Sequence, residues 1–243
     1  MIDQKTAKQR LSDLKVIAEV TGDIEAEYEW AYYHQMNPDS ENMKDSKLAV
    51  QYYEKCIAQD YQPMWSRYYL ANTLDTEIKD YKRAVEVYEE LLDERYADNS
   101  DVRGIVYYEL GDHYSQGKGV EQDCQKAYEY FTEGNKVTEC VDNLVGIGDC
   151  YYNGWYVDQD YEKAFDLYNE ALLQSYDYPG VVTNCEASRA MAMERIGRCF
   201  MYGNGVKQNL EKARGFLEDS YDTYSYSDIV TRELLYLETL EDE

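Results

Sequence analysis

The side chains that most often carry out enzyme chemistry are sparse in this sequence. Only two histidines, His34 and His113, occur among 243 residues. Either could serve as a general base or a metal ligand, but neither belongs to an HExxH motif, and no GxSxG motif, phosphate-binding loop or dinucleotide fingerprint is present. Asp158 and Asp160 have the spacing of two calcium ligands, yet the rest of an EF-hand loop is missing. These patterns predict no catalytic residue, no metal site and no cofactor.

The cysteines do not form a recognisable pattern either. The chain has six of them, and an even number permits disulfides, but no CxxC pair or regular spacing occurs. We therefore expect free thiols in the core, where cysteine behaves as a small apolar residue. The residues are Cys56, Cys124, Cys140, Cys150, Cys185 and Cys199.

The charge balance limits the classes of partner. The formal net charge is −25, from 24 basic and 49 acidic residues. Binding to nucleic acid or to an anionic membrane depends on Lys and Arg, so we expect neither. The acidity is compatible with basic partners, or with good solubility alone. Because no signal-peptide pattern and no apolar run of roughly 20 residues occurs, we expect a cytoplasmic protein.

An internal repeat must position whatever functional side chains the chain has. Gly111 and Ala127, Gly148 and Ala164, and Gly197 and Ala213 are each 16 residues apart, since 127 − 111 = 164 − 148 = 213 − 197 = 16. In each copy an aromatic residue follows the glycine by three positions, then a turn, then Lys-Ala and large apolar residues. Weaker copies centre on Ala31 and Ala49 and on Ala71 and Ala84. Such self-similarity indicates a repeat array.

Within a copy, apolar residues recur at helical spacing. One stripe, at positions i, i+3, i+4 and i+7, consists of Tyr107, Leu110, Gly111 and Tyr114. A glycine in a helix costs about 1 kcal/mol relative to alanine. Glycines that recur in register therefore predict a close approach of the two helices of each pair. Asp123 and Asp160 precede the second helices and are expected to cap them.

The two ends of the chain predict terminal helices that cover the end repeats. Residues 1–22, with Leu11, Leu14, Ile17 and Val20 at three-residue steps, predict an N-terminal capping helix. Residues 222–243 predict an acidic C-terminal capping helix that begins at Ser227 or Asp228. Five repeats are expected between them, over 24–221. Their approximate ranges are 24–60, 64–97, 102–137, 140–176 and 185–221.

These residues resemble the Sel-one-like repeat (SLR), a relative of the tetratricopeptide repeat with a longer hairpin. Residues 107–131 and 193–217 match its apolar-Gly, aromatic, Gly-x-Gly-Val and Lys-Ala pattern closely, and 144–168 match with Trp155-Tyr156 in place of the usual x-Gly. Residues 66–90 look more like a plain tetratricopeptide unit, and 26–55 match least. The resemblance implies an all-α fold, a right-handed α-solenoid of about five antiparallel helix pairs with N- and C-terminal capping helices.

The similarity to tetratricopeptide repeats also implies that the first helix of each pair lines a concave groove. Relative to the small residue in the first helix of each copy, the groove positions lie three residues before it and one, four and five residues after it. The candidate partner-binding residues are Tyr28, Tyr32, Tyr68, Asn72, Asp75, Tyr108, Asp112, Ser115, Asp149, Tyr152, Glu194, Arg198 and Tyr202. Such a surface suits an extended peptide with a basic or polar segment. The tyrosines could equally pack between hairpins, and the aspartates could be solvated helix surface.

The sequence thus favours a non-catalytic scaffold or adaptor that binds a protein or peptide in the groove. The alternative is an acidic mimic that occupies the nucleic-acid-binding surface of another protein, and its affinity would fall more steeply with salt. A secreted, cysteine-rich branch of the resembling family has been linked to penicillin binding and β-lactamase-like activity. We expect no such activity here, because the signal peptide and paired cysteines of that branch are missing. The oligomeric state is left open.

Overall fold

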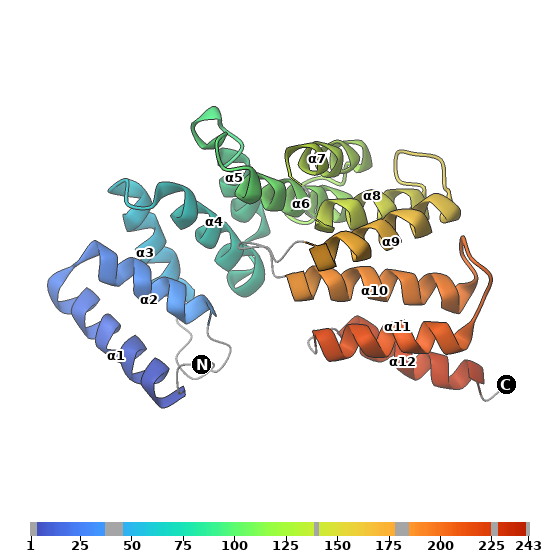
Figure 1. The fold of residues 1–243 in the computed structure, drawn as a ribbon. Coiled ribbons are helices and arrows are strands. Elements are labelled where there is room, and N and C mark those ends of the chain that lie inside the picture. Colours follow the sequence, from blue (N-terminus) through green and yellow to red (C-terminus); the bar gives the residue numbers. More distant parts are fainter. Residues whose placement is uncertain (1–3, 37–45, 139–140, 178–184, 225–227, 242–243) are drawn as a thin grey trace. The chain divides into compact units, whose positions relative to one another are not determined.

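The computed structural model describes residues 4–36, 46–138, 141–177, 185–224 and 228–241, and every regular element in these ranges is a helix (Figure 1). The chain divides into two compact units. Unit 1 comprises Met1–Ala97 and Lys118–Glu121, and unit 2 comprises Asp98–Gly117 and Gln122–Glu243. Each unit is described by itself.

Unit 1 is built around large aromatic side chains. Its helices are α1 (Gln4–Thr21), α2 (Ile24–Met36), α3 (Ser46–Ala58), α4 (Pro63–Thr73) and α5 (Tyr81–Glu90), with a π-helical turn η2 (Leu74–Ile78) and a 3₁₀ turn η3 (Glu94–Tyr96). Trp30, Tyr53 and Tyr88 are fully buried. Pro63 lies in the first turn of α4, where its missing N–H leaves no hydrogen bond unmade. Helices that follow one another from α1 to α5 pack against each other.

Unit 2 contains the three copies with the 16-residue spacing. Its helices are α6 (Ser100–Gln116), α7 (Cys124–Val137), α8 (Val141–Asn153), α9 (Tyr161–Asp177), α10 (Cys185–Tyr202), α11 (Leu210–Thr223) and α12 (Asp228–Glu241). Leu144, Tyr168, Ile196 and Leu217 belong to one buried cluster. Neighbouring helices from α8 to α12 pack side by side (Figure 1). The first helix α8 also contacts the first helices α6 and α10 of the neighbouring pairs.

The predicted all-α repeat fold is confirmed. In the described residues α2 to α11 form five helix pairs of the α-solenoid type, with α1 before them and α12 after them. The expected caps are also present: the Asp123 and Asp160 carboxylates accept hydrogen bonds from the backbone N–H groups of Lys126 and Lys163, both at 2.9 Å.

The close approach of paired helices is confirmed as well. A Cβ atom added to the first-helix glycine of each copy would overlap a side chain of the second helix. The overlaps are Gly111 with Phe131, Gly148 with Tyr168 and Gly197 with Leu217. The glycines are therefore contact points of packed helices.

The helix predicted at residues 1–22 is present as α1, but its apolar series at three-residue steps does not form one buried face. Leu11 and Ala18 are each 2% exposed, whereas Ile17 is 45% and Val20 78% exposed. A helix turns by about 100° per residue, so Val20, nine residues after Leu11, lies on the opposite side. Ala18, seven residues on, returns to the buried face. Three-residue steps drift around a helix, and only the first members of the series pack inward.

The thiols described by the structure are free. Cys56, Cys150 and Cys199 are buried, and Cys124 is partly buried at the start of α7. Burial raises the pKa of Cys56 to about 11 and those of Cys150 and Cys199 to about 12, so these three stay protonated. The expectation of free core thiols is thus confirmed for these three; Cys140 and the side chain of Cys185 lie outside the described residues.

None of the helices in the described ranges is both long and apolar enough to cross a membrane.

Candidate functional site

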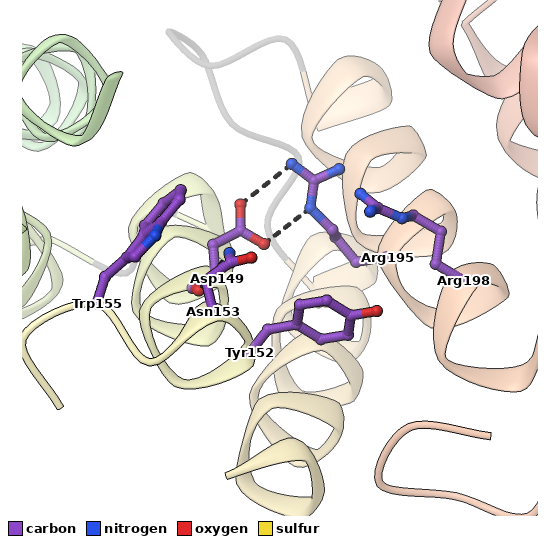
Figure 2. Close-up of a pocket in the computed structure, with 6 residues that line it drawn as sticks. All are labelled: Asp149, Tyr152, Asn153, Trp155, Arg195 and Arg198. Atoms are coloured by element: carbon purple, nitrogen blue, oxygen red, sulfur yellow. Dashed lines mark hydrogen bonds and ion pairs between the residues drawn. The ribbon is translucent and has the colours of Figure 1, made fainter. Parts of the chain in front are cut away.

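The candidate site is a pocket of about 220 Å³ between α8 and α10 in unit 2 (Figure 2). Helix α8 contributes three lining residues, the following turn one, and α10 two. They are Asp149, Tyr152, Asn153, Trp155, Arg195 and Arg198. The small residues Gly148 and Gly197 set the register of both helices, so the side chains one residue after each glycine, Asp149 and Arg198, reach the same space.

A bidentate ion pair crosses the pocket. Arg195 donates from Nε to Asp149 Oδ1 at 2.8 Å and from Nη2 to Asp149 Oδ2 at 3.1 Å. Tyr168 Oη also donates to Asp149 Oδ1, at 2.8 Å. The two charged side chains are only 21% and 20% exposed. Because forked Arg–carboxylate pairs are strong and directional, this pair holds α8 and α10 in a fixed relation.

A second arginine extends the network toward α12. Arg198 pairs with Glu194 at 3.5 Å and, through Nε, with Glu233 Oε1 at 3.0 Å. Glu194 is buried and also contacts Arg195. Burial raises the pKa of Glu233 to about 7, and Glu194 adds to this while Arg198 opposes it. Three carboxyl groups thus face two guanidinium groups, and neither arginine offers a free positive charge.

Aromatic rings form the other walls. Tyr152 Oη accepts a hydrogen bond from Asn204 Nδ2 at 2.7 Å, and the Tyr152 ring meets the Tyr161 ring edge-on with centroids 5.1 Å apart. Burial raises the pKa of Tyr152, so its hydroxyl remains a donor. Trp155 lies on the opposite side of Asp149 from the two arginines (Figure 2). The Arg198 guanidinium lies 5.8 Å from the centroid of the Tyr152 ring, so the aromatic and ionic groups of the pocket adjoin.

The groups that line the pocket are aromatic, amide and paired ionic side chains. No histidine or cysteine lines it, and its carboxylates are held by guanidinium groups rather than placed beside a nucleophile. In the described part of the chain, no group of three or more His, Cys, Asp or Glu side chains is arranged to hold a metal ion. A ligand in the pocket would contact aromatic surface, the exposed Asn153 amide and polar groups that are already held by hydrogen bonds and ion pairs.

Of the predicted site residues in unit 2, four come together here. Asp149, Tyr152 and Arg198 line the pocket, and Glu194 pairs with Arg198 beside it. Tyr202 is exposed one turn further along α10, with its ring 6.4 Å from that of Tyr236.

The remaining predicted residues of unit 2 lie on α6 and make internal contacts. Tyr108 packs on Phe131 and donates from Oη to Met191 Sδ at 3.4 Å. Asp112 accepts a hydrogen bond from Gln116. Ser115 is 3% exposed, and its hydroxyl donates to the Asp112 carbonyl at 2.9 Å, so this hydroxyl is not available to a partner.

In unit 1 the predicted tyrosines form a chain of touching rings. Ring centroids are 6.4 Å apart for Tyr28 and Tyr32, 5.2 Å for Tyr32 and Tyr69, and 5.3 Å for Tyr69 and Tyr68. Tyr28, Tyr32 and Tyr68 are half-buried. Each therefore packs against neighbouring helices with part of its ring and leaves the rest at the surface.

The polar residues predicted in unit 1 are engaged as well. Asn72 accepts a hydrogen bond from Gln35, which links α4 to α2. Asp75 is buried and forms an ion pair with Lys118 at 3.0 Å. Asn72 lies beside the tyrosine rings at the surface, whereas Asp75 is part of the packing.

Sequence reasoning missed Arg195, Asn153 and Trp155. Arg195 lies two residues before Gly197, a position outside the groove pattern used for the prediction. Its opposite charge to Asp149 was a usable signal, but only once α8 and α10 are known to be neighbours. Trp155 occupies the variable position of the Gly-x-Gly turn, where the other two glycine-turn copies have Lys118 and Asn204, so its type gave no signal of a site.

Comparison with known proteins agrees with this repeat architecture. A family model described as Sel1 repeat matches residues 24–61, 105–134, 143–176 and 190–220. It leaves out residues 62–104, which contain the copy centred on Ala71 and Ala84. No curated protein matches the chain.

The solved structures that are similar to the chain include the following two. One is a Sel1 repeat protein from Oxalobacter formigenes, with 14% identity, 90% of this chain and 79% of that chain covered, and a TM-score of 0.57. The other is a protective antigen present in uropathogenic Escherichia coli strains that displays an SLR fold, with 23% identity, 93% of this chain covered and a TM-score of 0.47. The match covers 51% of that second protein.

Proposed function

The chain belongs to the Sel1 repeat family, and from this premise we propose that it is a non-catalytic scaffold that binds an extended peptide or protein segment on the first helices of its repeats. Sel1 repeat proteins generally act as protein-interaction scaffolds, and their fold is typically non-catalytic. The proposal adds the binding surface of this particular chain.

The pocket between α8 and α10 is the observation that carries the proposal. Its ionic groups are already paired, with Arg195 on Asp149 and Arg198 on Glu194 and Glu233. A partner therefore meets a surface that need not reorganise, and preorganisation lowers the free-energy cost of binding. Tyr152 and Trp155 supply stiff aromatic area, which is typical of residues that dominate binding energy.

The half-buried tyrosines of unit 1 support a second contact surface. Tyr28, Tyr32 and Tyr68 present rings held by their neighbours, and Asn72 lies near them with an amide already oriented by Gln35. Aromatic rings beside amides are well suited to hydrogen-bond and stack on the backbone of an extended segment.

A displayed library of random dodecapeptides, selected on the full-length protein, tests the proposal. We expect enriched peptides to bind the wild type and to lose about tenfold in affinity with Tyr152→Ser, which corresponds to about 1.4 kcal/mol. Tyr221→Ser is the matched control, because Tyr221 is exposed on α11 and does not line the pocket. Equal affinity of both variants, with unchanged far-UV circular dichroism, would rule out the α8–α10 pocket as the binding surface.

The net charge of −25 favours the alternative function of an acidic mimic. The dependence of binding affinity on salt concentration distinguishes this alternative from the proposed function. An aromatic surface should lose little affinity when NaCl is raised, whereas a mimic of phosphate charge should lose affinity steeply. Turnover of a chromogenic β-lactam above that of a heat-treated sample would contradict the non-catalytic part of the proposal.

A further inference from the structure

One turn of the repeat array departs from its own pattern at the edge of the pocket. The turns Gly117–Val120 and Gly203–Val206 carry a second glycine, Gly119 or Gly205, whereas Gly154–Val157 carries Tyr156 at that position. The backbone is nevertheless the same: φ is +79° at Gly119, +72° at Gly205 and +64° at Tyr156. Tyr156 therefore adopts a left-handed conformation that side chains other than glycine rarely adopt.

The other two turns show why glycine is the structural choice there. A Cβ atom on Gly119 would overlap the backbone of Tyr81, and one on Gly205 would overlap the backbone of Tyr161. In both cases the turn lies against the start of the second helix of the preceding repeat. A tyrosine at this position works against the local backbone preference. Strain of this kind persists where the surroundings enforce it, and it concentrates at binding sites.

The departure puts an aromatic residue, Tyr156, directly after the pocket residue Trp155 in the chain. Trp155 lines the pocket itself, on the far side of Asp149 from the arginines (Figure 2). Tyr156 is 56% exposed, and its ring contacts that of Tyr128 on α7, with centroids 5.7 Å apart and planes 49° from parallel. This exposure leaves most of the Tyr156 ring available to a ligand.

The surroundings of the turn are acidic. Asp158, Asp160 and Glu162 follow it directly and are exposed. Lys163 is the only cation between residues 153 and 166, and its ammonium group donates to Tyr151 Oη at 2.7 Å. Arg195 and Arg198 are held by carboxylates across the pocket. A ligand that approaches Trp155 and Tyr156 therefore meets aromatic side chains close in the chain to the exposed carboxylate of Asp158.

We propose that the Trp155–Tyr156 turn recognises a lysine or arginine side chain of an extended peptide bound at the α8–α10 pocket. The cationic group stacks on the aromatic faces, and Asp158 supplies the counter-charge. This inference rests on the proposed function and names the chemistry of the partner.

The first part of the test is the composition of the peptides that the dodecapeptide library yields. We expect Lys and Arg to be enriched among peptides whose binding depends on Tyr152. For one such peptide, replacing the basic residue with norleucine should weaken binding to the wild type by about threefold to fivefold, the size expected for an exposed cation–π contact.

The second part is a double-mutant cycle between the peptide and the protein. Tyr156→Gly restores the glycine of the other turns and should lower the affinity for the basic peptide by a similar factor. The affinity for the norleucine peptide should not fall any further with this variant. Lys79→Gly is the matched control, because Lys79 also has a positive φ, +63°, but lies in unit 1. Asp158→Asn provides a second variant that leaves the turn backbone unchanged. It should lower the affinity for the basic peptide only.

Stability distinguishes recognition from a packing role. Because Tyr156→Gly relieves a left-handed tyrosine, its melting temperature should equal or exceed that of the wild type. A lowered melting temperature with no coupling to the basic residue would overturn the inference and assign Tyr156 to packing. Peptides that depend on Tyr152 but ignore Tyr156, Asp158 and their own basic residues would also overturn it while leaving the proposed function intact. If no peptide binds in a Tyr152-dependent way, the proposed function fails first.

Discussion

At the scale of single residues, the carboxyl group of Glu233 is unusually placed. It lies on α12, is largely buried, and meets Arg198 at 3.0 Å. Its pKa is raised from 4.5 to about 7, because burial and Glu194 disfavour the charged form more than Arg198, Arg195 and Arg232 favour it. The folded protein therefore keeps a proton that the unfolded chain releases between pH 4.5 and 7. The stability contributed by this group is present at low pH and is lost as the pH rises through that window.

Replacement of Glu233 by Gln should remove this pH dependence. The melting temperature of Glu233→Gln, relative to the wild type, is expected to increase from pH 5 to pH 8, because only the wild type must bury a charge at the higher pH. Thermal melts followed by circular dichroism measure the difference. Glu238→Gln, an exposed change on the same helix, should show no such trend. A constant or decreasing difference for Glu233→Gln would contradict the expectation.

At the scale of helices, the repeat depends on small residues at the crossing of each pair. Gly148 on α8 faces the ring of Tyr168 on α9, and a Cβ there would lie 2.5 Å from the ring atom Cε1. Glycine is unfavourable inside a helix, so its use at this position reflects packing and not helix propensity. Local sequence preference and tertiary packing thus oppose each other at Gly148, and packing decides.

Gly148→Ala should therefore destabilise the protein in spite of the better helix former. Overpacking of this kind costs about 1–3 kcal/mol, or about 2–4 °C of melting temperature per kcal/mol for a chain of this size. Gly215→Ala is the control, since nothing lies within 4 Å of a Cβ at that exposed position on α11. It should raise stability by about 0.5–1 kcal/mol. A Gly148→Ala variant as stable as Gly215→Ala would show that Tyr168 moves aside freely.

Elements and their pairing could be predicted because they depend on residues close in the chain. The 16-residue spacing identified the crossings, and the capping roles of Asp123 and Asp160 followed from their place before the second helices. The buried face of α1 could not be predicted from the apolar series alone. Ile17 and Val20 are as apolar as Leu11, and only contact with α2 selects the face that carries Leu11 and Ala18.

At the scale of the whole molecule, the dominant feature is a formal charge of −25 over 243 residues. Mutual repulsion of the carboxylates opposes the compact state in both units. Exposed ion pairs such as Lys136 with Glu133 offset little of it, because pairs in water contribute at most about 1 kcal/mol.

Added salt should consequently stabilise the protein. We expect the melting temperature to rise when NaCl is increased from low to moderate concentration, because screening weakens net repulsion more than it weakens the few exposed ion pairs. Scanning calorimetry at matched pH measures the change. A melting temperature that falls with NaCl would mean that attractive ion pairs, and not the net charge, dominate the electrostatics of folding.

The sequence by itself determined that this protein is a helical repeat with close-packed helix pairs, because periodicity and spacing are relations between neighbours in the chain. It also pointed to Asp149, Tyr152, Glu194 and Arg198. Only the tertiary structure decided that these side chains share one pocket with Arg195, which lies 46 residues from its partner Asp149. Such contacts depend on how α8 and α10 rotate against each other. The left-handed backbone of Tyr156 likewise follows from the turn that surrounds it and not from any preference of tyrosine.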